Sequence, residues 1–118
     1  MAVKAFNCNK IKRTFWPLTF KDDADDAGKT IKRGITIMVN MPKKSVFEEL
    51  TNISNIEENT ATVNDIGAIY DVLEAILSNN ASRYSVSREE LEKYDIEECL
   101  EIIKAYMEFI DELKTDPN

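Results

Sequence analysis

The residues with the clearest potential for chemistry form the run KDDADDAGK at positions 21–29. Four aspartates and a glycine within seven positions suggest a calcium loop, because Ca²⁺ is bound through carboxylate oxygens. An EF-hand loop beginning at Asp23 would place Ala27 at its fifth position and Gly34 at its twelfth, where oxygen ligands are required. The spacing therefore favours a charged turn between two strands, and we expect no metal and no cofactor.

The chain contains no histidine, which removes the commonest general base and the commonest metal ligand. Neighbouring carboxylates such as Glu57–Glu58 and Glu97–Glu98 lie in polar stretches, and no feature of the sequence places them in an apolar pocket. No glycine-rich phosphate loop is present. We therefore expect a protein that is not an enzyme and has no catalytic residues.

Charge divides the chain into two parts. Residues 1–44 hold ten Lys and Arg against four Asp, whereas residues 45–118 hold five against eighteen acidic residues. The charges of +6 and −13 give the net charge of −7. This asymmetry is consistent with association with a charged partner or with another copy, and equally with two solvated faces.

A nucleic-acid site is the other possibility that the basic residues raise. Lys12, Arg13, Lys32 and Arg33 have the charge to contact phosphates, and the neighbouring Trp16 could stack on bases. The four aspartates lie between the two basic groups, however, and the whole chain is acidic. We therefore expect no nucleic-acid partner and keep this use of the basic residues as an alternative.

The sequence before residue 44 has the pattern of a β-hairpin. Residues 13–20 (RTFWPLTF) are rich in Thr and aromatic side chains, and Pro17, which cannot donate to a ladder, predicts an edge strand or an interrupted one. In residues 30–40 (TIKRGITIMVN), apolar side chains alternate at Ile35, Ile37 and Val39, which predicts one buried face. Gly34, just before them, suggests a bulge or bend. The acidic run then lies at the hairpin tip.

The sequence after residue 44 has the pattern of a helical group. We predict helices at about residues 45–52, 64–78, 88–93 and 96–114. N-cap residues with an acidic residue three positions later are Ser45, Ser87 and Asp95. In the last helix, apolar residues recur at steps of four and three from Ile96 to Ile110, which predicts a stripe that packs on another helix.

These patterns predict an α+β fold in which the N-terminal hairpin packs on the C-terminal helices. We expect one domain over residues 1–118, with a basic hairpin part (1–44) and an acidic helical part (45–118). No apolar run is long enough to span a membrane, and the N-terminus does not look like a secretory signal. An intracellular protein with reduced Cys8 and Cys99 is expected.

The helical part resembles the tail assembly chaperones of long-tailed, siphovirus-type bacteriophages and prophages of Gram-positive bacteria. The resemblance rests on the run DIGAIYDVLEAILSNN followed by YSVSREELEKYDIEECLEIIKAYMEFIDE, and on ITIMVNMPKKSVFEEL before them. It covers roughly residues 35–113, whereas residues 1–34 lie outside it. Its motifs are helical patterns and not catalytic signatures.

The resemblance implies a non-enzymatic role in virion morphogenesis. Such chaperones hold the tape measure protein before the tail tube polymerises around it, and the tail tube protein is a further possible partner. They act in the host bacterial cytoplasm and are absent from the mature virion. The resemblance provides no binding residues, and a generic acidic protein-binding adaptor is a second alternative function.

Our hypothesis from the residues is that Tyr106, Met107, Phe109 and Ile110 contribute to a protein-binding face on the last helix. Phe109 motivates it, because this aromatic side chain lies off the centre of the apolar stripe. The opposite charges of the two parts also suggest self-association, with copies joined head to tail.

Overall fold

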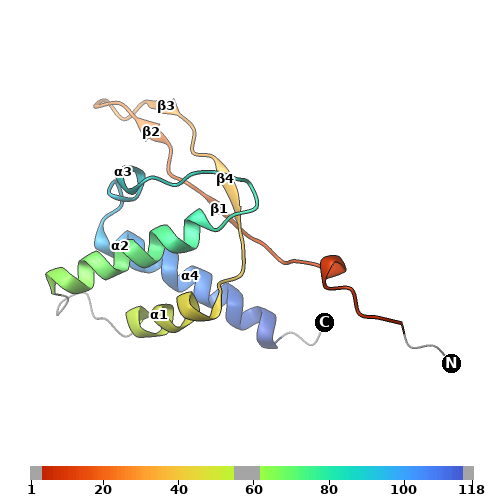
Figure 1. Ribbon diagram of the computed structural model, residues 1–118. Helices are drawn as coiled ribbons and strands as arrows, with labels where there is room; N and C mark the ends of the chain where they lie inside the picture. Colours follow the sequence, from red (N-terminus) through yellow and green to blue (C-terminus); the bar gives the residue numbers. More distant parts are fainter. Residues whose placement is uncertain (1–3, 55–61, 116–118) are drawn as a thin grey trace.

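The structure is a computed structural model that describes residues 4–54 and 62–115. An extended arm (residues 4–15) with one 3-10 turn, η1 (Cys8–Lys10), leads into a hairpin. The strands are β1 (Trp16–Thr19), β2 (Asp23–Ala24), β3 (Thr30–Lys32) and β4 (Thr36–Val39). The helices in the described residues are α1 (Lys44–Ser54), α2 (Val63–Ser78), α3 (Arg88–Leu91) and α4 (Ile96–Thr115). In Figure 1, α2 and α4 lie between the hairpin and α1, which confirms the predicted α+β fold.

The hairpin consists of two antiparallel strand pairs. β1 pairs with β4, with Leu18 opposite Ile37, and β2 pairs with β3 farther along the same hairpin. The Phe20 N–H donates to the carbonyl oxygen of Ile35 at 3.0 Å. Along an antiparallel strand, the backbone N–H groups of successive residues point alternately toward the partner strand and away from it. The backbone nitrogen of Pro17 therefore points away from β4, and its missing N–H costs no hydrogen bond between the strands. β1 is an edge strand, as Pro17 predicted.

Gly34 lies where the chain bends between β3 and β4. A Cβ atom at this position would lie 1.8 Å from the carbonyl oxygen of Phe20, so the two strands can approach this closely only because residue 34 is glycine. The neighbouring Ile35 is 37% exposed, and the predicted buried face of the strand is therefore limited to Ile37 and Val39.

Local side-chain caps set most of the helix starts. Asp95 caps α4 and Ser87 caps α3, as predicted, because each side chain accepts a hydrogen bond from the N–H three residues later, at 2.7 and 3.2 Å. Thr62 caps α2 in the same way, so this helix begins one residue before the predicted start. α1 begins at Lys44, and the prediction that Ser45 is its N-cap is wrong. In the ranges that the structure describes, no helix is long and apolar enough to cross a membrane.

One hydrophobic core joins the hairpin to the helices. It contains Ile37 and Val39 of β4 together with residues of α1, α2 and α4. Tyr106 links the layers directly, because its ring lies 5.0 Å from the ring of Trp16 and its hydroxyl donates to the carbonyl oxygen of Asn40 at 2.6 Å. Leu18 of β1 also belongs to this core, so both strands of the β1–β4 pair contribute to it.

The buried core makes stability sensitive to alkaline pH. Burial raises the pKa of Tyr106 above its ordinary value of 10.0, and burial also raises the pKa of Cys99 above 9.0. The unfolded chain would lose these protons before the folded chain does, so the stability that these two groups contribute should be fully present at neutral pH and should decrease as the pH rises above about 9. Urea denaturation between neutral and alkaline pH measures this, and Tyr106→Phe should make the decrease shallower. Stability that increased with alkaline pH would contradict the prediction.

Candidate functional site: a groove with a basic rim

The four residues predicted to bind a partner do not form one surface. Tyr106 and Ile110 are buried, with 1% and 2% of their surfaces exposed, and belong to the core. Met107 and Phe109 are half-buried, but each step along an α-helix turns by about 100°, so they project about 200° apart. A partner therefore cannot reach Tyr106 and meets only a small exposed edge of Ile110, and it would reach Met107 and Phe109 from opposite sides of the buried stripe.

The acidic run at the hairpin tip is stabilised by hydrogen bonds of its own. The carboxylate of Asp25 accepts from the backbone N–H groups of Ala27 and Lys29, at 3.0 and 2.8 Å. Gly28 has a φ of 82°, a left-handed conformation that closes the turn. Asp22 reaches across the hairpin and accepts from the N–H of residue 34 at 2.7 Å. Two of the aspartates therefore organise the backbone of the turn.

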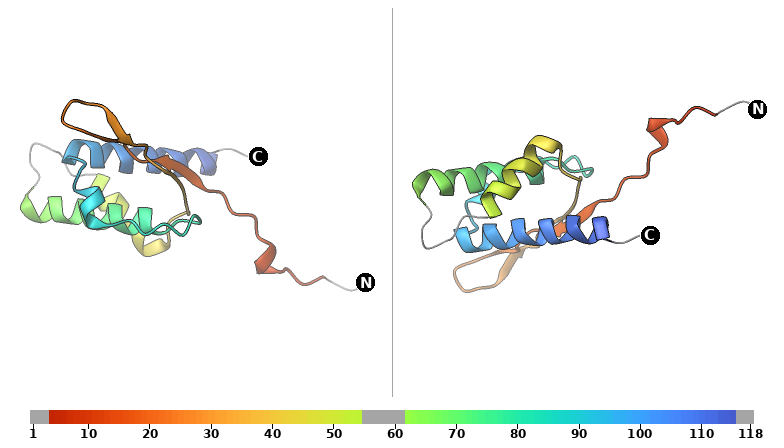
Figure 2. Two further views of the ribbon diagram at one scale, coloured as in Figure 1. Left: turned by 90° about the horizontal axis from the view of Figure 1, so that it is seen from above. Right: turned by 90° about the horizontal axis from the view of Figure 1, so that it is seen from below.

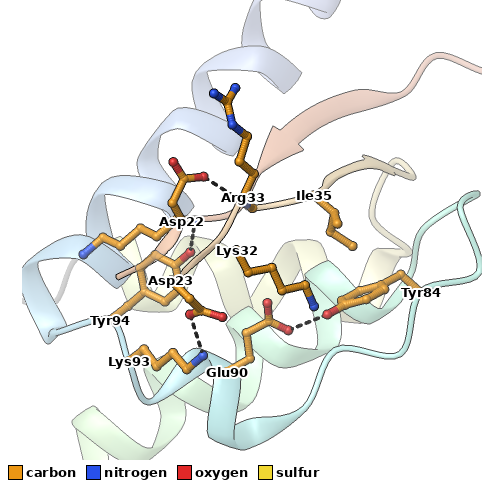
Figure 3. Close-up of a pocket in the computed structure, with 11 residues that line it drawn as sticks. Asp22, Asp23, Lys32, Arg33, Ile35, Tyr84, Glu90, Lys93 and Tyr94 are labelled. Atoms are coloured by element: carbon orange, nitrogen blue, oxygen red, sulfur yellow. Dashed lines mark hydrogen bonds and ion pairs between the residues drawn. The ribbon is translucent and has the colours of Figure 1, made fainter. Parts of the chain in front are cut away.

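A small pocket of about 110 Å³ lies where the hairpin meets α3 (Figure 3). Asp23 and Lys93 form an ion pair beside it at 3.0 Å, and the Tyr84 hydroxyl donates to a carboxylate of α3 at 2.9 Å. The N–H of Lys21 donates to the Tyr94 hydroxyl at 2.8 Å. Each of these contacts satisfies one group of the pocket with another, and the contacts Asp23–Lys93 and Lys21–Tyr94 fasten the hairpin to the helical part. We therefore interpret this pocket as a structural joint.

Calcium should not change the stability of the protein. In the described part of the chain, no three His, Cys, Asp or Glu side chains are placed to hold a metal ion. The carboxylates of Asp22 and Asp25 already accept backbone hydrogen bonds, which a cation would have to replace. A calcium titration followed by thermal unfolding, with EDTA as the reference, should leave the melting temperature unchanged. A rise of several degrees would show a site that binds the folded state.

A groove is lined by residues of the arm, the β4–α1 connection and the C-terminal half of α4. In Figure 1, these three segments lie at the same end of the molecule. Two adjoining pockets of about 610 and 290 Å³ form it and share Met41. Its apolar floor is formed by Met41, Phe47, Ile110 and Leu113, and its basic rim by Lys12, Arg13, Lys43 and Lys44. We call this surface the end groove.

The fold presents the floor of the end groove to solvent on a rigid backbone. Met41 is 37% exposed and Leu113 is 39% exposed, although both are large apolar side chains. Asn40, the residue before Met41, is held by two hydrogen bonds. Its backbone N–H donates to the carbonyl oxygen of Asn79 at 2.9 Å, and the carbonyl oxygen of Asn40 accepts from the hydroxyl of Tyr106. Apolar surface held in this way can be covered by a partner without reordering the backbone.

Among the described residues, the rim of the end groove is uniformly positive and no acidic side chain lines the groove. Lys12, Arg13 and Lys43 form no ion pair with any other described residue, and Lys44 lies 4.0 Å from Glu48. A cleft lined by charges of one sign attracts ligands of the opposite sign. The groove therefore suits an apolar segment that carries acidic residues at its margins.

Sequence reasoning did not find the end groove as a unit. In the sequence, Lys12 and Arg13 stand out by their charge and Ile110 by its place in the apolar stripe, but they are about a hundred positions apart in the chain. The local signal was the run MPKK at positions 41–44, where an exposed apolar residue and two lysines follow a strand. Only the fold brings this run beside the arm and Leu113.

Comparison with known proteins gives no further guide to the family, because no protein-family model, no curated protein and no solved structure matches this chain.

Proposed function

We propose that this protein is a tail assembly chaperone of a long-tailed bacteriophage or prophage, which holds the tape measure protein before the tail tube polymerises. It acts by protein–protein contact, without catalysis, in the bacterial cytoplasm and outside the finished virion. The observation that carries the proposal is the end groove, whose apolar floor and basic rim suit an amphipathic helix with acidic margins. The sequence resemblance over residues 35–113 supports the choice of partner.

The groove offers enough apolar surface to contribute to binding. Full burial of one large aliphatic side chain contributes about 1.5–3 kcal/mol, and Met41 and Leu113 are each more than one-third exposed before a partner binds. The basic rim would orient an acidic helix and accelerate its association, since long-range charge acts mainly on encounter and specificity. The floor should therefore set the lifetime of the complex and the rim its rate of formation.

Co-expression with the tape measure protein of the same phage or prophage tests this function. Met41→Asp should weaken co-purification at least tenfold, because it places a charge in the apolar floor of the groove. Met38→Asp is the matched control, since Met38 is 41% exposed three residues earlier but lies outside the groove. Equal binding by the wild type and Met41→Asp would contradict the proposed site, and failure of the wild type to bind would contradict the function.

Two other outcomes would favour the alternative functions. DNA binding that weakens steeply with salt and is lost when Lys12, Arg13, Lys32 and Arg33 are reversed in charge would indicate a nucleic-acid-binding regulator. A gene that lies away from tail genes, with a partner unrelated to tails, would indicate an acidic adaptor. A gene between those of the tail tube and the tape measure protein is the arrangement that our proposal expects.

A further inference from the structure

The N-terminal arm extends away from the body of the molecule (Figure 2). The radius of gyration is 17.3 Å, against about 13 Å for a compact chain of this length. Within the described structure, the hydrogen bonds of residues 4–11 join these residues only to one another. The arm is therefore ordered locally by its 3-10 turn while most of its surface is open to a partner.

The arm combines apolar side chains with positive charge. Phe6 is 79% exposed and Ile11 is 55% exposed, the former among the most exposed large apolar residues of the protein. Lys4, Lys10, Lys12 and Arg13 lie in the same segment, which contains no acidic residue. Burying Phe6 and Ile11 would be favourable, and the four positive charges favour an acidic surface for that burial.

The outer face of α4 has the complementary properties. From Ile96 to Leu113 the helix carries six carboxylates and one lysine. Glu101, Glu108 and Glu112 are spaced by seven and four residues and therefore form one exposed acidic row. Ile102 and Phe109, which are half-buried, form an apolar row beside it, with the exposed Ala105 between the two rows.

We propose that the arm of one copy docks along this outer face of α4 in a second copy, with Phe6 and Ile11 against the Ile102–Phe109 row. The twelve residues of the arm reach up to about 40 Å when extended, and a helix of twenty residues is about 30 Å long, so one arm can follow the helix. The arm and the acceptor face are different surfaces, so the contact is heterologous and joins copies head to tail into a ring or an open chain.

This contact uses other apolar residues than the end groove, although Lys12 and Arg13 of the arm also belong to the basic rim of the groove. The arm residues Phe6 and Ile11 do not line the groove, and neither do Ala105 and Phe109 of the acceptor face. Met41→Asp should therefore leave self-association unchanged while it weakens partner binding. Failure of one proposal is thereby distinguishable from failure of the other.

The cysteines allow a direct test. Cys8 in the arm is exposed and Cys99 is buried, so Cys8 is the accessible thiol of the described chain. With Ala105→Cys in the acceptor face, oxidation should produce a ladder of disulfide-linked copies, and peptide mapping should show position 8 of one chain joined to position 105 of another. Ala68→Cys, at an exposed position on α2, is the control and should give no such ladder. Isotope-labelled and unlabelled copies mixed before oxidation separate links between chains from links within a chain.

Sedimentation measures the strength of the contact. Phe6→Asp should weaken self-association by about tenfold or more, and salt at about 1 M should weaken it as well, because screening is then almost complete. Lys10→Glu and Glu108→Lys should each weaken it, and the double variant should recover part of the loss. A wild type that stays monomeric at high concentration, links confined to single chains, or equal ladders from Ala105→Cys and Ala68→Cys would overturn the proposal.

Discussion

Replacing Gly34 with alanine is expected to destabilise the protein by about 3 kcal/mol, since forcing extra atoms into a packed site costs this much when the surroundings cannot yield. The added Cβ would lie 1.8 Å from the carbonyl oxygen of Phe20 and 2.8 Å from that of Lys21, and both are backbone atoms that cannot rotate away. The chain segments at the end of β1 and the start of β4 would therefore have to move apart. The hydrogen bond from the N–H of Gly34 to Asp22 would be strained at the same time.

Gly67→Ala is the matched control for this substitution. Gly67 lies within α2, and a Cβ added there meets no atom within 4 Å. Because alanine favours a helix interior over glycine, this variant should gain about 0.5–1 kcal/mol. Denaturant unfolding of both variants measures the two effects. Equal midpoints for Gly34→Ala and the wild type would contradict the close approach of the strands.

Replacing Tyr106 with alanine should cost about 3–5 kcal/mol, the usual range for removing a large aromatic side chain from a core. Tyr106 is 1% exposed, and its ring packs on Trp16. Its hydroxyl donates to the carbonyl oxygen of Asn40, next to Met41 of the end groove. The variant should therefore lose partner binding through unfolding. This separates Tyr106 from Met41, whose substitution should remove binding from a protein that stays folded.

Tyr106→Phe isolates the contribution of the hydroxyl. It keeps the ring but leaves the carbonyl oxygen of Asn40 without this donor, which should cost about 1–3 kcal/mol. Trp16 is the single tryptophan of the chain and lies against this ring, so its fluorescence reports both variants. If Tyr106→Ala and Tyr106→Phe both unfolded at the same denaturant concentration as the wild type, Tyr106 would not join the hairpin to the helices.

Features decided by neighbouring residues could be predicted from the sequence. The caps of α3 and α4 depend on side chains three residues apart, and the hairpin on alternation and a tip rich in Asp and Gly. The start of α2 at Thr62 had a similar local signal, a threonine followed by Asp65, which the predicted boundary overlooked. Only the start of α1 departs from its local pattern, because Lys43 accepts the first helical hydrogen bond.

Features decided by contacts between distant residues could not be predicted. The spacing of Met107 and Phe109 already implies opposite sides of a helix, but it does not tell which neighbour buries Tyr106 and Ile110 between them. Ile35 follows the alternation of its strand and is nevertheless 37% exposed, because it lines the open pocket between the hairpin and α3. The end groove is formed by the arm, the β4–α1 connection and the C-terminal half of α4, and no local sequence pattern connects these three segments.

The most direct test of the central claim is oxidative footprinting of Met38 and Met41 in the complex with the tape measure protein. The two side chains are similarly exposed, at 41% and 37%, in the free protein, so they should be oxidised at similar rates. Our account predicts that binding protects Met41, on the floor of the end groove, and leaves Met38 unchanged. Protection of Met38 with continued oxidation of Met41 would place the partner elsewhere and contradict the account.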